Sequence, residues 1–273
     1  MRATEVLHER GQSLWLDNIT RGLLDDGTIQ RYIDDYSVTG LTSNPSIFDK
    51  AIGSGYYDDA IRDKVSAGLS EEELFFELAI EDLRRAADLF LPIHDRTAGV
   101  DGWVSLEVSP LLADDTSKTV AAAASLSKRA GRPNLFIKIP GTPAGLPAIT
   151  ESIAAGVPVN VTLLFSASQY LAAADAYLQG VERRVAEDLD PAVGSVASVF
   201  MSRWDVAVAS TVPEDLVDKL ALAVGLDVYR AYRKLMESER VQRLENDGVR
   251  MQRLLWASTG TKDPKASDTL YVQ

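Results

Sequence analysis

Short apolar runs alternate with longer segments of helical periodicity along most of the chain. The runs are four to seven residues long and rich in β-branched and aromatic residues, which is typical of strands. They are LWLD at 14–17, VTGLT at 38–42, WVSLEV at 103–108, LFIKI at 135–139, VNVTLLF at 159–165, SVASVF at 195–200 and RLLWAS at 253–258. The pattern therefore predicts seven strands.

Helical patterns fill most of the intervals between these runs. Predicted helices cover 117–130, 166–188 and 214–238, and in the last of these Leu216, Leu220, Ala223 and Leu226 recur at helical spacing. A further helix is predicted at 71–90, with Leu74, Leu78, Leu83, Ala86 and Phe90 on one apolar face. Three acidic residues favour its start, and Pro92 is expected to end it.

Strands that alternate with helices indicate parallel β/α units, because parallel neighbours need a crossover connection. The sequence therefore predicts an α/β fold of the (β/α)₈ TIM-barrel type, with an extra helical layer from 71–90. A doubly wound sheet is the rival, but neither GxGxxG nor GxxxxGK[ST] follows the first run. No eighth strand is evident after residue 258, and no Pro/Ser/Gly linker divides the chain.

Composition and charge exclude several classes of function. The chain has 273 residues, of which 46% are hydrophobic, and its formal net charge of −12 argues against a nucleic-acid partner. The absence of cysteine excludes disulfides, thiol catalysis and Cys-ligated zinc, and two histidines give little support to a histidine metal site. We see no signal peptide or membrane-spanning run, and expect a cytoplasmic protein without a membrane partner.

Polar residues stand at the ends of the predicted strands, where barrel enzymes place their active sites. A buried charge costs on the order of several kcal/mol unless it is paired, so polar residues within such apolar runs point to a function. These residues are Asp17, Thr42, Asn44, Glu107, Lys138, Asn160, Thr162, Ser198 and Ser258.

Lys138 lies within the apolar run LFIKIP, where alternation places it on the same strand face as Phe136. Three interpretations remain open from the residues alone. The amine snorkels to solvent or pairs with Glu107 or Asp17, it binds a phosphate, or it is a nucleophile that forms a Schiff base with a ketone. The two carboxylates fit general acid/base roles beside such an amine, although either could instead form a helix cap or a salt bridge.

Seven motifs, in this order, resemble those of the transaldolase family. They are WLDNIT at 15–20, GLTSNPSIF at 40–48, VSLEVSP at 104–110, LFIKIPGT at 135–142, VNVTLLFS at 159–166, SVASVFMSR at 195–203 and WASTGTKDP at 256–264. The resemblance implies a class I Schiff-base enzyme of the pentose phosphate pathway on a (β/α)₈ barrel. It also implies that no metal or organic cofactor is required.

Carried over position by position, the resemblance makes Lys138 the Schiff-base lysine and Asp17 the acid/base for the C4 hydroxyl. Glu107 matches the acid/base that acts through a water on the imine, and Thr162 the residue that positions this water. Asn44, Asn160 and Ser198 match substrate-binding positions. Asn44 before Pro45 is also a turn signal, and Asn160 or Thr162 could instead satisfy backbone groups.

The last two motifs carry the phosphate-binding positions that the resemblance implies. Arg203 matches the main phosphate anchor and Ser258 a phosphate-binding serine, whereas Gly260 stands where better-known members have a second arginine. Lys262 is expected to substitute for that arginine. At position 200 this chain has a phenylalanine, Phe200, as the transferring members of the superfamily do. Hydrolytic aldolase relatives commonly have tyrosine at this position, and its hydroxyl could help to activate water.

The expected activity moves a dihydroxyacetone unit from sedoheptulose 7-phosphate to glyceraldehyde 3-phosphate, giving erythrose 4-phosphate and fructose 6-phosphate. Two alternatives stay open, an aldolase that releases free dihydroxyacetone and an impaired relative that only binds sugar phosphates. Family members continue past DTLYV through an eighth strand and terminal helices. We therefore expect one barrel domain over 1–273 that is shortened at its C-terminus, or a homo-oligomer whose partner covers the open barrel edge.

Overall fold

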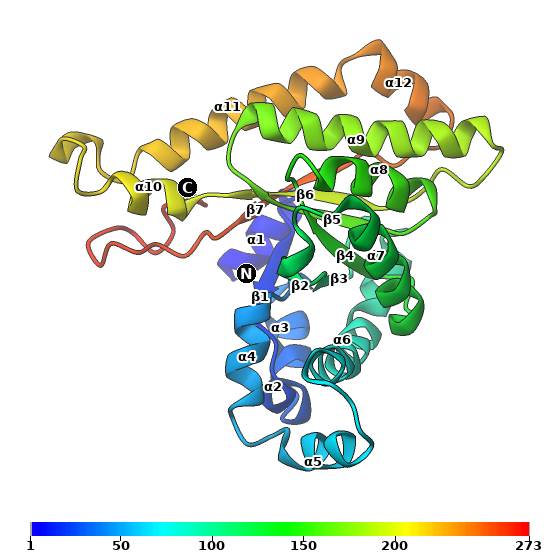
Figure 1. Ribbon diagram of the computed structural model, residues 1–273. Coiled ribbons are helices and arrows are strands. Elements are labelled where there is room, and N and C mark those ends of the chain that lie inside the picture. The colour runs from blue at the N-terminus through cyan, green and yellow to red at the C-terminus, as the bar shows by residue number, and fades with distance from the viewer. Residues whose placement is uncertain (1, 273) are drawn as a thin grey trace. The chain divides into compact units, whose positions relative to one another are not determined.

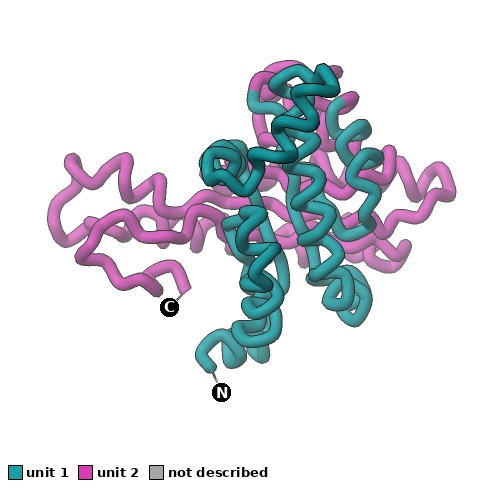
Figure 2. Tube along the Cα trace, turned by 90° about the horizontal axis from the view of Figure 1, so that it is seen from below, with its two compact units in different colours: residues 1–110, 122–138 teal, residues 111–121, 139–273 magenta. Residues whose placement is uncertain are grey.

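The computed structural model describes residues 2–272, and its helices and strands are labelled in Figure 1. The chain forms two compact units, coloured separately in Figure 2. The first comprises residues 1–110 and 122–138, and the second comprises residues 111–121 and 139–273. The division falls within helix α7 (Thr116–Ala130) and within strand β4 (Leu135–Pro140).

The strands of the first unit are parallel neighbours in chain order. They are β1 (Leu14–Asp17), β2 (Val38–Thr42), β3 (Trp103–Glu107) and the first residues of β4. Asp17 lies opposite Thr42 and Glu107 lies opposite Lys138, so polar residues share the carboxyl edge of these strands. This is the edge at which the sequence predicts the chemistry.

In the described part of the first unit, one helix precedes β1 and five further helices follow or connect these strands. They are α1 (Ala3–Glu9), α2 (Arg21–Asp25), α3 (Thr28–Tyr36), α4 (Pro45–Ile52), α5 (Asp58–Ser66) and α6 (Glu71–Arg96). Side chains of Thr20, Asn44 and Ser70 cap α2, α4 and α6, each accepting a backbone N–H bond three residues ahead. The predicted apolar face of α6 is confirmed, because Leu78, Leu83, Ala86 and Phe90 are fully buried.

The prediction that Pro92 ends this helix is wrong, because α6 continues to Arg96 with Pro92 inside it. A proline removes one backbone hydrogen bond, but the last turn has other support. Ile93 is buried, and its carbonyl oxygen accepts bonds from both the backbone N–H and the hydroxyl of Thr97. The helix then ends where Ala98 and Gly99 adopt left-handed backbone angles.

The second unit continues the same alternation. Its strands are the end of β4, β5 (Val159–Leu164), β6 (Ser195–Phe200) and β7 (Arg253–Ala257), with β5–β6 and β6–β7 parallel. Its helices are α8 (Gly145–Ala154), α9 (Ala167–Ala186), α10 (Ser202–Val208), α11 (Leu220–Met236) and α12 (Glu239–Asn246). Short 3₁₀ turns, η1 (Pro110–Leu112) and η2 (Glu214–Leu216), complete the elements of the described residues.

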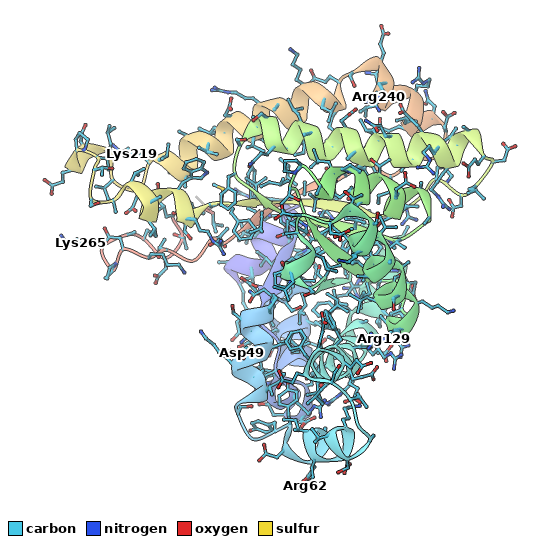
Figure 3. The ribbon with its side chains drawn as sticks, in the orientation of Figure 1. Asp49, Arg62, Arg129, Lys219, Arg240 and Lys265 are labelled. Atoms are coloured by element: carbon cyan, nitrogen blue, oxygen red, sulfur yellow. The ribbon has the colours of Figure 1, made fainter. Side chains whose placement is uncertain are left out.

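Helices of the second unit pack in sequence against one another, α8 against α9 and α9 against α11 (Figure 1). Gly180 permits the first contact, since a Cβ atom there would lie 2.7 Å from Ile153 Cβ. Arg240, labelled in Figure 3, ties α12 to α9. Its guanidinium donates two hydrogen bonds to Glu182, at 2.7 and 2.8 Å, and one to Asp175 at 2.6 Å.

The helix predicted at 214–238 is shorter than expected and buries a different face. Residues 214–216 form η2, and α11 begins only at Leu220, after Asp218 in a left-handed conformation. Ala221, Gly225 and Val228 are its buried positions, whereas Leu216 and Leu226 are exposed. Close approach explains the small residues, because a Cβ at Gly225 would lie 2.8 Å from Met201 Cε.

Strand order distinguishes the two predicted architectures. The strands follow one another in chain order, β1 to β4 in the first unit and β5 to β7 in the second, without the reversal that defines a doubly wound sheet. The fold is therefore of the α/β TIM-barrel type, with seven strands and no eighth strand within residues 2–272. In the same range, no helix combines the length and the apolar character that crossing a membrane requires.

Candidate active site

Lys138 is the buried cation of the first unit. All six residues of β4 are buried, and Lys138 retains only 6% of its exposure. Its ammonium donates a 3.0 Å hydrogen bond to the carbonyl oxygen of Ser43 and lies 3.4 Å from Glu107 Oε2. Snorkelling to solvent is thus excluded, and the predicted ion pair with Glu107 is confirmed.

The register of β3 and β4 produces this pair. Glu107 and Lys138 are direct partners on neighbouring parallel strands, so their side chains leave the strands on the same face. The Ser43 carbonyl is held in place by its own residue, because Ser43 Oγ donates a 2.8 Å hydrogen bond to the Ser105 carbonyl oxygen on β3. The amine is therefore oriented by one carbonyl and one carboxylate before any substrate binds.

An aromatic layer shares the strand face that carries Lys138. Phe136 stacks on Trp103 with ring centroids 3.9 Å apart and on Trp15 at 6.3 Å. Gly40 makes room for this layer, since a Cβ there would lie 2.5 Å from the Trp15 indole. Apolar rings on this face limit water access from that side and strengthen electrostatic interactions of the amine.

Asp17 and Asn44 stand at the carboxyl ends of β1 and β2 but differ in their surroundings. Asp17 is the last residue of β1 and is exposed. Asn44 is half-buried, and its Oδ1 atom accepts a 3.1 Å hydrogen bond from the Ile47 backbone, which caps α4. The oxygen of Asn44 thus serves as a helix cap, and a substrate contact would rest on its amide nitrogen.

In the second unit, β5 and β6 bring Asn160 and Ser198 together. Both are buried, and the Ser198 hydroxyl donates a 2.6 Å hydrogen bond to Asn160 Oδ1. Thr162 is buried two residues further along β5. Its carbonyl oxygen accepts a 2.8 Å hydrogen bond from the Gly141 backbone just after β4. This bond joins β5 to the segment that directly follows the lysine-bearing strand.

A bulge interrupts β5 directly after Thr162. Pairing with β6 shifts register between Val161 and Leu164, and Leu163 adopts a φ of 61°. That angle is unusual for a leucine, and the bulge leaves Leu163 exposed between two buried neighbours. Such bulges re-aim side chains near active sites, and no simple strand alternation in the sequence predicts this one.

Phe200 and Arg203 lie where β6 passes into α10. The Phe200 ring packs 5.5 Å from that of Phe165, and the Arg203 guanidinium carbon lies 4.7 Å from the Phe200 centroid. Arg203 itself is exposed. Stacking on an aromatic face positions the guanidinium while leaving its N–H groups available for an anion.

Ser258 and Lys262 follow β7. Ser258 has a φ of 54°, and its hydroxyl lies 3.0 Å from that of Ser202, a residue that the sequence did not single out. The backbone N–H of Ser202 also donates a 3.0 Å bond to the Ser258 carbonyl oxygen. Lys262 is exposed beside Gly260, whose missing Cβ would lie 3.6 Å from its amine.

The structure thus brings together some of the predicted residues within each unit. Lys138 pairs with Glu107, Asn160 with Ser198, and Phe200 with Arg203. Ser43 and Ser202, which contribute backbone or hydroxyl groups, were not among the predicted residues. Both stand directly beside predicted residues in the motifs TSNPS and FMSR, which is the one signal that could have found them. No cluster of His, Cys, Asp and Glu suited to a metal ion occurs in the described part of the chain.

The structure thus defines a protein of the β/α-barrel type with a buried lysine–carboxylate pair at the carboxyl edge of its parallel strands, the edge where such proteins hold their active sites. Comparison of the sequence with known proteins identifies the family to which the chain belongs. Residues 14–273 match the family described as transaldolase/fructose-6-phosphate aldolase. The chain belongs to this family, and it is an enzyme of the transferase type.

Individual relatives match over almost the whole chain. It is 46% identical to the transaldolase of Saccharopolyspora erythraea, with 98% of this chain and 75% of the relative aligned. The transaldolase of Thermobifida fusca is also 46% identical, over 98% of this chain and 75% of its own length. For that of Trichodesmium erythraeum the identity is 42%, over 96% and 73%. Sugar phosphates are the substrates that this family implies.

Proposed function

We propose that this chain transfers a dihydroxyacetone unit between sugar phosphates through an imine on Lys138. The donor is a ketose phosphate such as sedoheptulose 7-phosphate or fructose 6-phosphate, and the acceptor is an aldose phosphate. The observation that carries the proposal is the buried amine, 3.0 Å from the Ser43 carbonyl oxygen and 3.4 Å from Glu107. A cytoplasmic location in the pentose phosphate pathway is part of the same proposal.

Imine formation uses the pair on β3 and β4. Glu107 Oε2 is close enough to accept a proton from the ammonium, directly or through one water, which gives Lys138 a nucleophilic lone pair. The amine then attacks the C2 carbonyl carbon of the donor, and the C–N bond forms. Glu107 returns this proton to the former carbonyl oxygen and passes on a second one from the nitrogen of the addition product, so that the oxygen leaves as water and the iminium remains.

Cleavage uses the iminium nitrogen as the electron sink, so the chemistry requires no metal or organic cofactor. Asp17 accepts the C4 hydroxyl proton, the C3–C4 bond breaks, and its electron pair moves into the iminium to give an enamine. The first aldose phosphate leaves. The enamine carbon then attacks the aldehyde of the acceptor, Asp17 returns its proton to the new hydroxyl, and water releases the product from Lys138.

Substrate binding is assigned to the polar residues of the second unit and to Asn44. The hydrogen-bonded amide and hydroxyl of Asn160 and Ser198 can hold sugar hydroxyls. Thr162 is proposed to position the water molecule that acts on the imine. Phosphate oxygens are assigned to Arg203 and Ser258, with Lys262 as a further cation beside Gly260.

Phe200 favours transfer over release of free dihydroxyacetone. Its ring packs against Phe165 and offers no hydroxyl to activate water. Hydrolysis of the enamine needs a proton and a water molecule before an acceptor arrives. An apolar ring at this position therefore favours an enamine that is not hydrolysed before the acceptor aldehyde binds.

The test supplies fructose 6-phosphate and erythrose 4-phosphate and measures sedoheptulose 7-phosphate against free dihydroxyacetone. We expect sedoheptulose 7-phosphate as the main product, and a Phe200→Tyr variant should shift product towards dihydroxyacetone. Main release of dihydroxyacetone by the parent chain would favour the aldolase alternative. Binding of both sugars without either product would favour the impaired relative.

A further inference from the structure

Asp82 is a buried carboxylate that the proposed reaction does not use. It lies on α6 with no exposed surface, and burial raises its pKa by more than the hydrogen bonds from Tyr57 and Arg21 lower it. Arg21 Nε donates a 3.0 Å bond to Oδ1, and the Tyr57 hydroxyl donates a 2.6 Å bond to Oδ2. A charge in such a place is tolerated only when it is paired this fully.

Its partner Arg21 stands four residues after Asp17, the proposed base. Arg21 is the first residue of α2, and its backbone N–H donates a 2.9 Å bond to the Tyr57 hydroxyl. The guanidinium also stacks on the Tyr57 ring, 4.5 Å from its centroid. Ile19, between Asp17 and Arg21, is fully buried. The segment that leaves β1 is therefore fixed at Asp17 by the sheet and at Arg21 by this network.

Tyr57 extends the same network to the segment that follows β2. It comes after α4, the helix that Asn44 caps, and packs in a core cluster with Ala51 and Leu78. One buried carboxylate thus receives bonds from residues that follow both β1 and β2. Glu107 on β3 and Lys138 on β4 lie outside the contacts described for Asp82.

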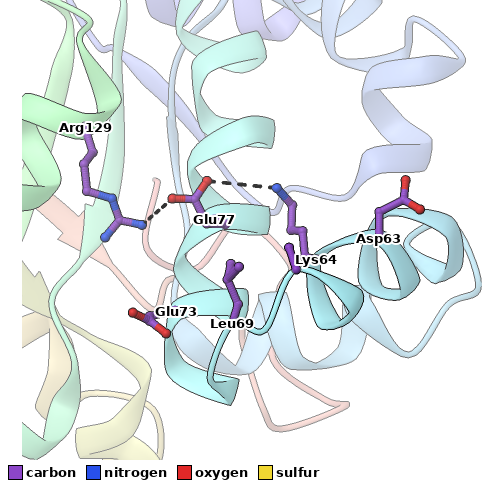
Figure 4. Close-up of a pocket in the computed structure, with 7 residues that line it drawn as sticks. Asp63, Lys64, Leu69, Glu73, Glu77 and Arg129 are labelled. Atoms are coloured by element: carbon purple, nitrogen blue, oxygen red, sulfur yellow. Dashed lines mark hydrogen bonds and ion pairs between the residues drawn. The ribbon is translucent and has the colours of Figure 1, made fainter.

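The second carboxylate on Arg21 is of a different kind. Glu81 accepts a 3.0 Å bond from the other arm of the guanidinium and a 2.6 Å ion pair from Lys64, but its side chain is 37% exposed. Lys64 also borders the open cleft of Figure 4, where Glu77 lies between it and Arg129. If Glu81 is removed, water can accept its hydrogen bond from Arg21. Asp82 is fully buried, so water cannot take its place in the same way. Glu81 is therefore a matched control on the same arginine.

We propose that Asp82 is a positioning residue for carbon–carbon bond cleavage, acting through Arg21 on the segment that carries Asp17. The inference rests on the proposed function. On this proposal, imine formation and carbon–carbon bond cleavage depend on Asp82 to different degrees. Asp82 positions the base that takes the C4 hydroxyl proton, and it does not position the amine that forms the imine. Loss of Asp82 slows cleavage and leaves imine formation in place. A displaced base of this kind costs roughly tenfold to a hundredfold in rate.

Reductive trapping distinguishes the two steps. Parent, Asp82→Asn and Glu81→Gln chains are incubated with fructose 6-phosphate and borohydride while glyceraldehyde 3-phosphate is removed enzymatically. The adduct on Lys138 is then identified by mass. Parent and Glu81→Gln should carry mainly the three-carbon adduct, whereas Asp82→Asn should carry mainly the uncleaved six-carbon phosphate adduct. Its kcat should fall roughly tenfold or more, with KM changed by less than about threefold.

A three-carbon adduct and a parental kcat in a folded Asp82→Asn chain would overturn the inference. If that variant does not fold, Arg21→Lys and Arg21→Met replace it. The lysine should retain more cleavage than the methionine while both form the imine. Equal loss of both adducts in the two variants would mean a merely structural role and overturn the inference. No adduct on the parent chain would instead overturn the proposed function.

Discussion

The cations assigned to the reaction are held in opposite ways in the two units. Lys138 in the first unit is buried and is contacted by a carbonyl oxygen and a carboxylate. Arg203 and Lys262 in the second unit are exposed, with Arg203 over the face of Phe200. The difference matches what each type of chemistry requires. A nucleophile must be desolvated and oriented beforehand, whereas an anion anchor stays hydrated until its phosphate arrives.

Electrostatics explains why these environments are not interchangeable. An unpaired ammonium buried in an apolar strand costs on the order of several kcal/mol, which Glu107 and the Ser43 carbonyl offset for Lys138. A solvent-exposed guanidinium carries no such penalty and gains hydrogen bonds when phosphate displaces water. Mutations of Lys138 and its partner Glu107 should therefore act on kcat, and mutations of the exposed cations on KM.

Replacement of the buried amine should have the largest effect. Lys138→Arg keeps the positive charge beside Glu107 but cannot form an imine, and we expect transfer activity to fall by at least roughly 10⁴-fold. The exposed Lys234→Arg on α11 is the matched control and should retain full activity. Steady-state transfer assays measure both. Activity within tenfold of the parent for Lys138→Arg would separate this lysine from the chemistry.

Neutralising the acid/base groups comes next. Glu107→Gln preserves the shape beside Lys138 but removes its proton acceptor, so kcat should fall by roughly 10²-fold or more. Asp17→Asn should cause a similar loss while allowing imine formation. Single-turnover rates and the extent of imine trapping distinguish the two. If both variants lose imine formation equally, the division of labour between Asp17 and Glu107 is wrong.

Removal of an exposed cation should weaken binding rather than chemistry. Arg203→Ala should raise KM for the phosphorylated donor by roughly 10- to 100-fold, because charged hydrogen bonds to phosphate are lost. The value of kcat at saturation should change little. Exposed Arg230→Ala on α11 provides a control with the same charge change. A drop in kcat with an unchanged KM would place Arg203 in the chemistry instead.

The aromatic layer should affect stability first. An added methyl at Gly40 would lie 2.5 Å from the Trp15 indole, so Gly40→Ala should destabilise the fold by roughly 1–3 kcal/mol. Gly53→Ala is the matched control, because the Cβ there would meet nothing closer than 3.6 Å. Urea unfolding compares the two. Equal urea midpoints for the two variants would show that the aromatic rings can shift at little cost and do not form a rigid layer beside Lys138.

The fold was largely predictable because buried parallel strands have a strong local signal. The runs at 38–42 and 195–200 coincide with β2 and β6. Pro92 and the face of α11 were not predictable locally, since the burial of Ile93 and the approach of Met201 to Gly225 are tertiary effects. The expectation of a single domain over 1–273 stays a prediction.

The site was predictable only where residue type carries the signal. Lys138 was predictable because a charged residue is unusual in an apolar strand, and its pairing with Glu107 was one of the open alternatives. The Ser43 carbonyl is a backbone atom that any residue possesses, so its identity gave no hint. Asp82 meets Arg21 across 61 positions of sequence, a separation that leaves no local pattern. The roles assigned to the individual site residues remain proposals.

The most direct test of the central claim is the position of the covalent adduct. The intact chain is incubated with fructose 6-phosphate, reduced with borohydride, digested and mapped by mass spectrometry. We expect one stable adduct on Lys138, in the peptide that contains LFIKIPGT, and none without reduction. An adduct on another lysine, or no adduct in folded protein that binds the sugar, would contradict the Schiff-base mechanism.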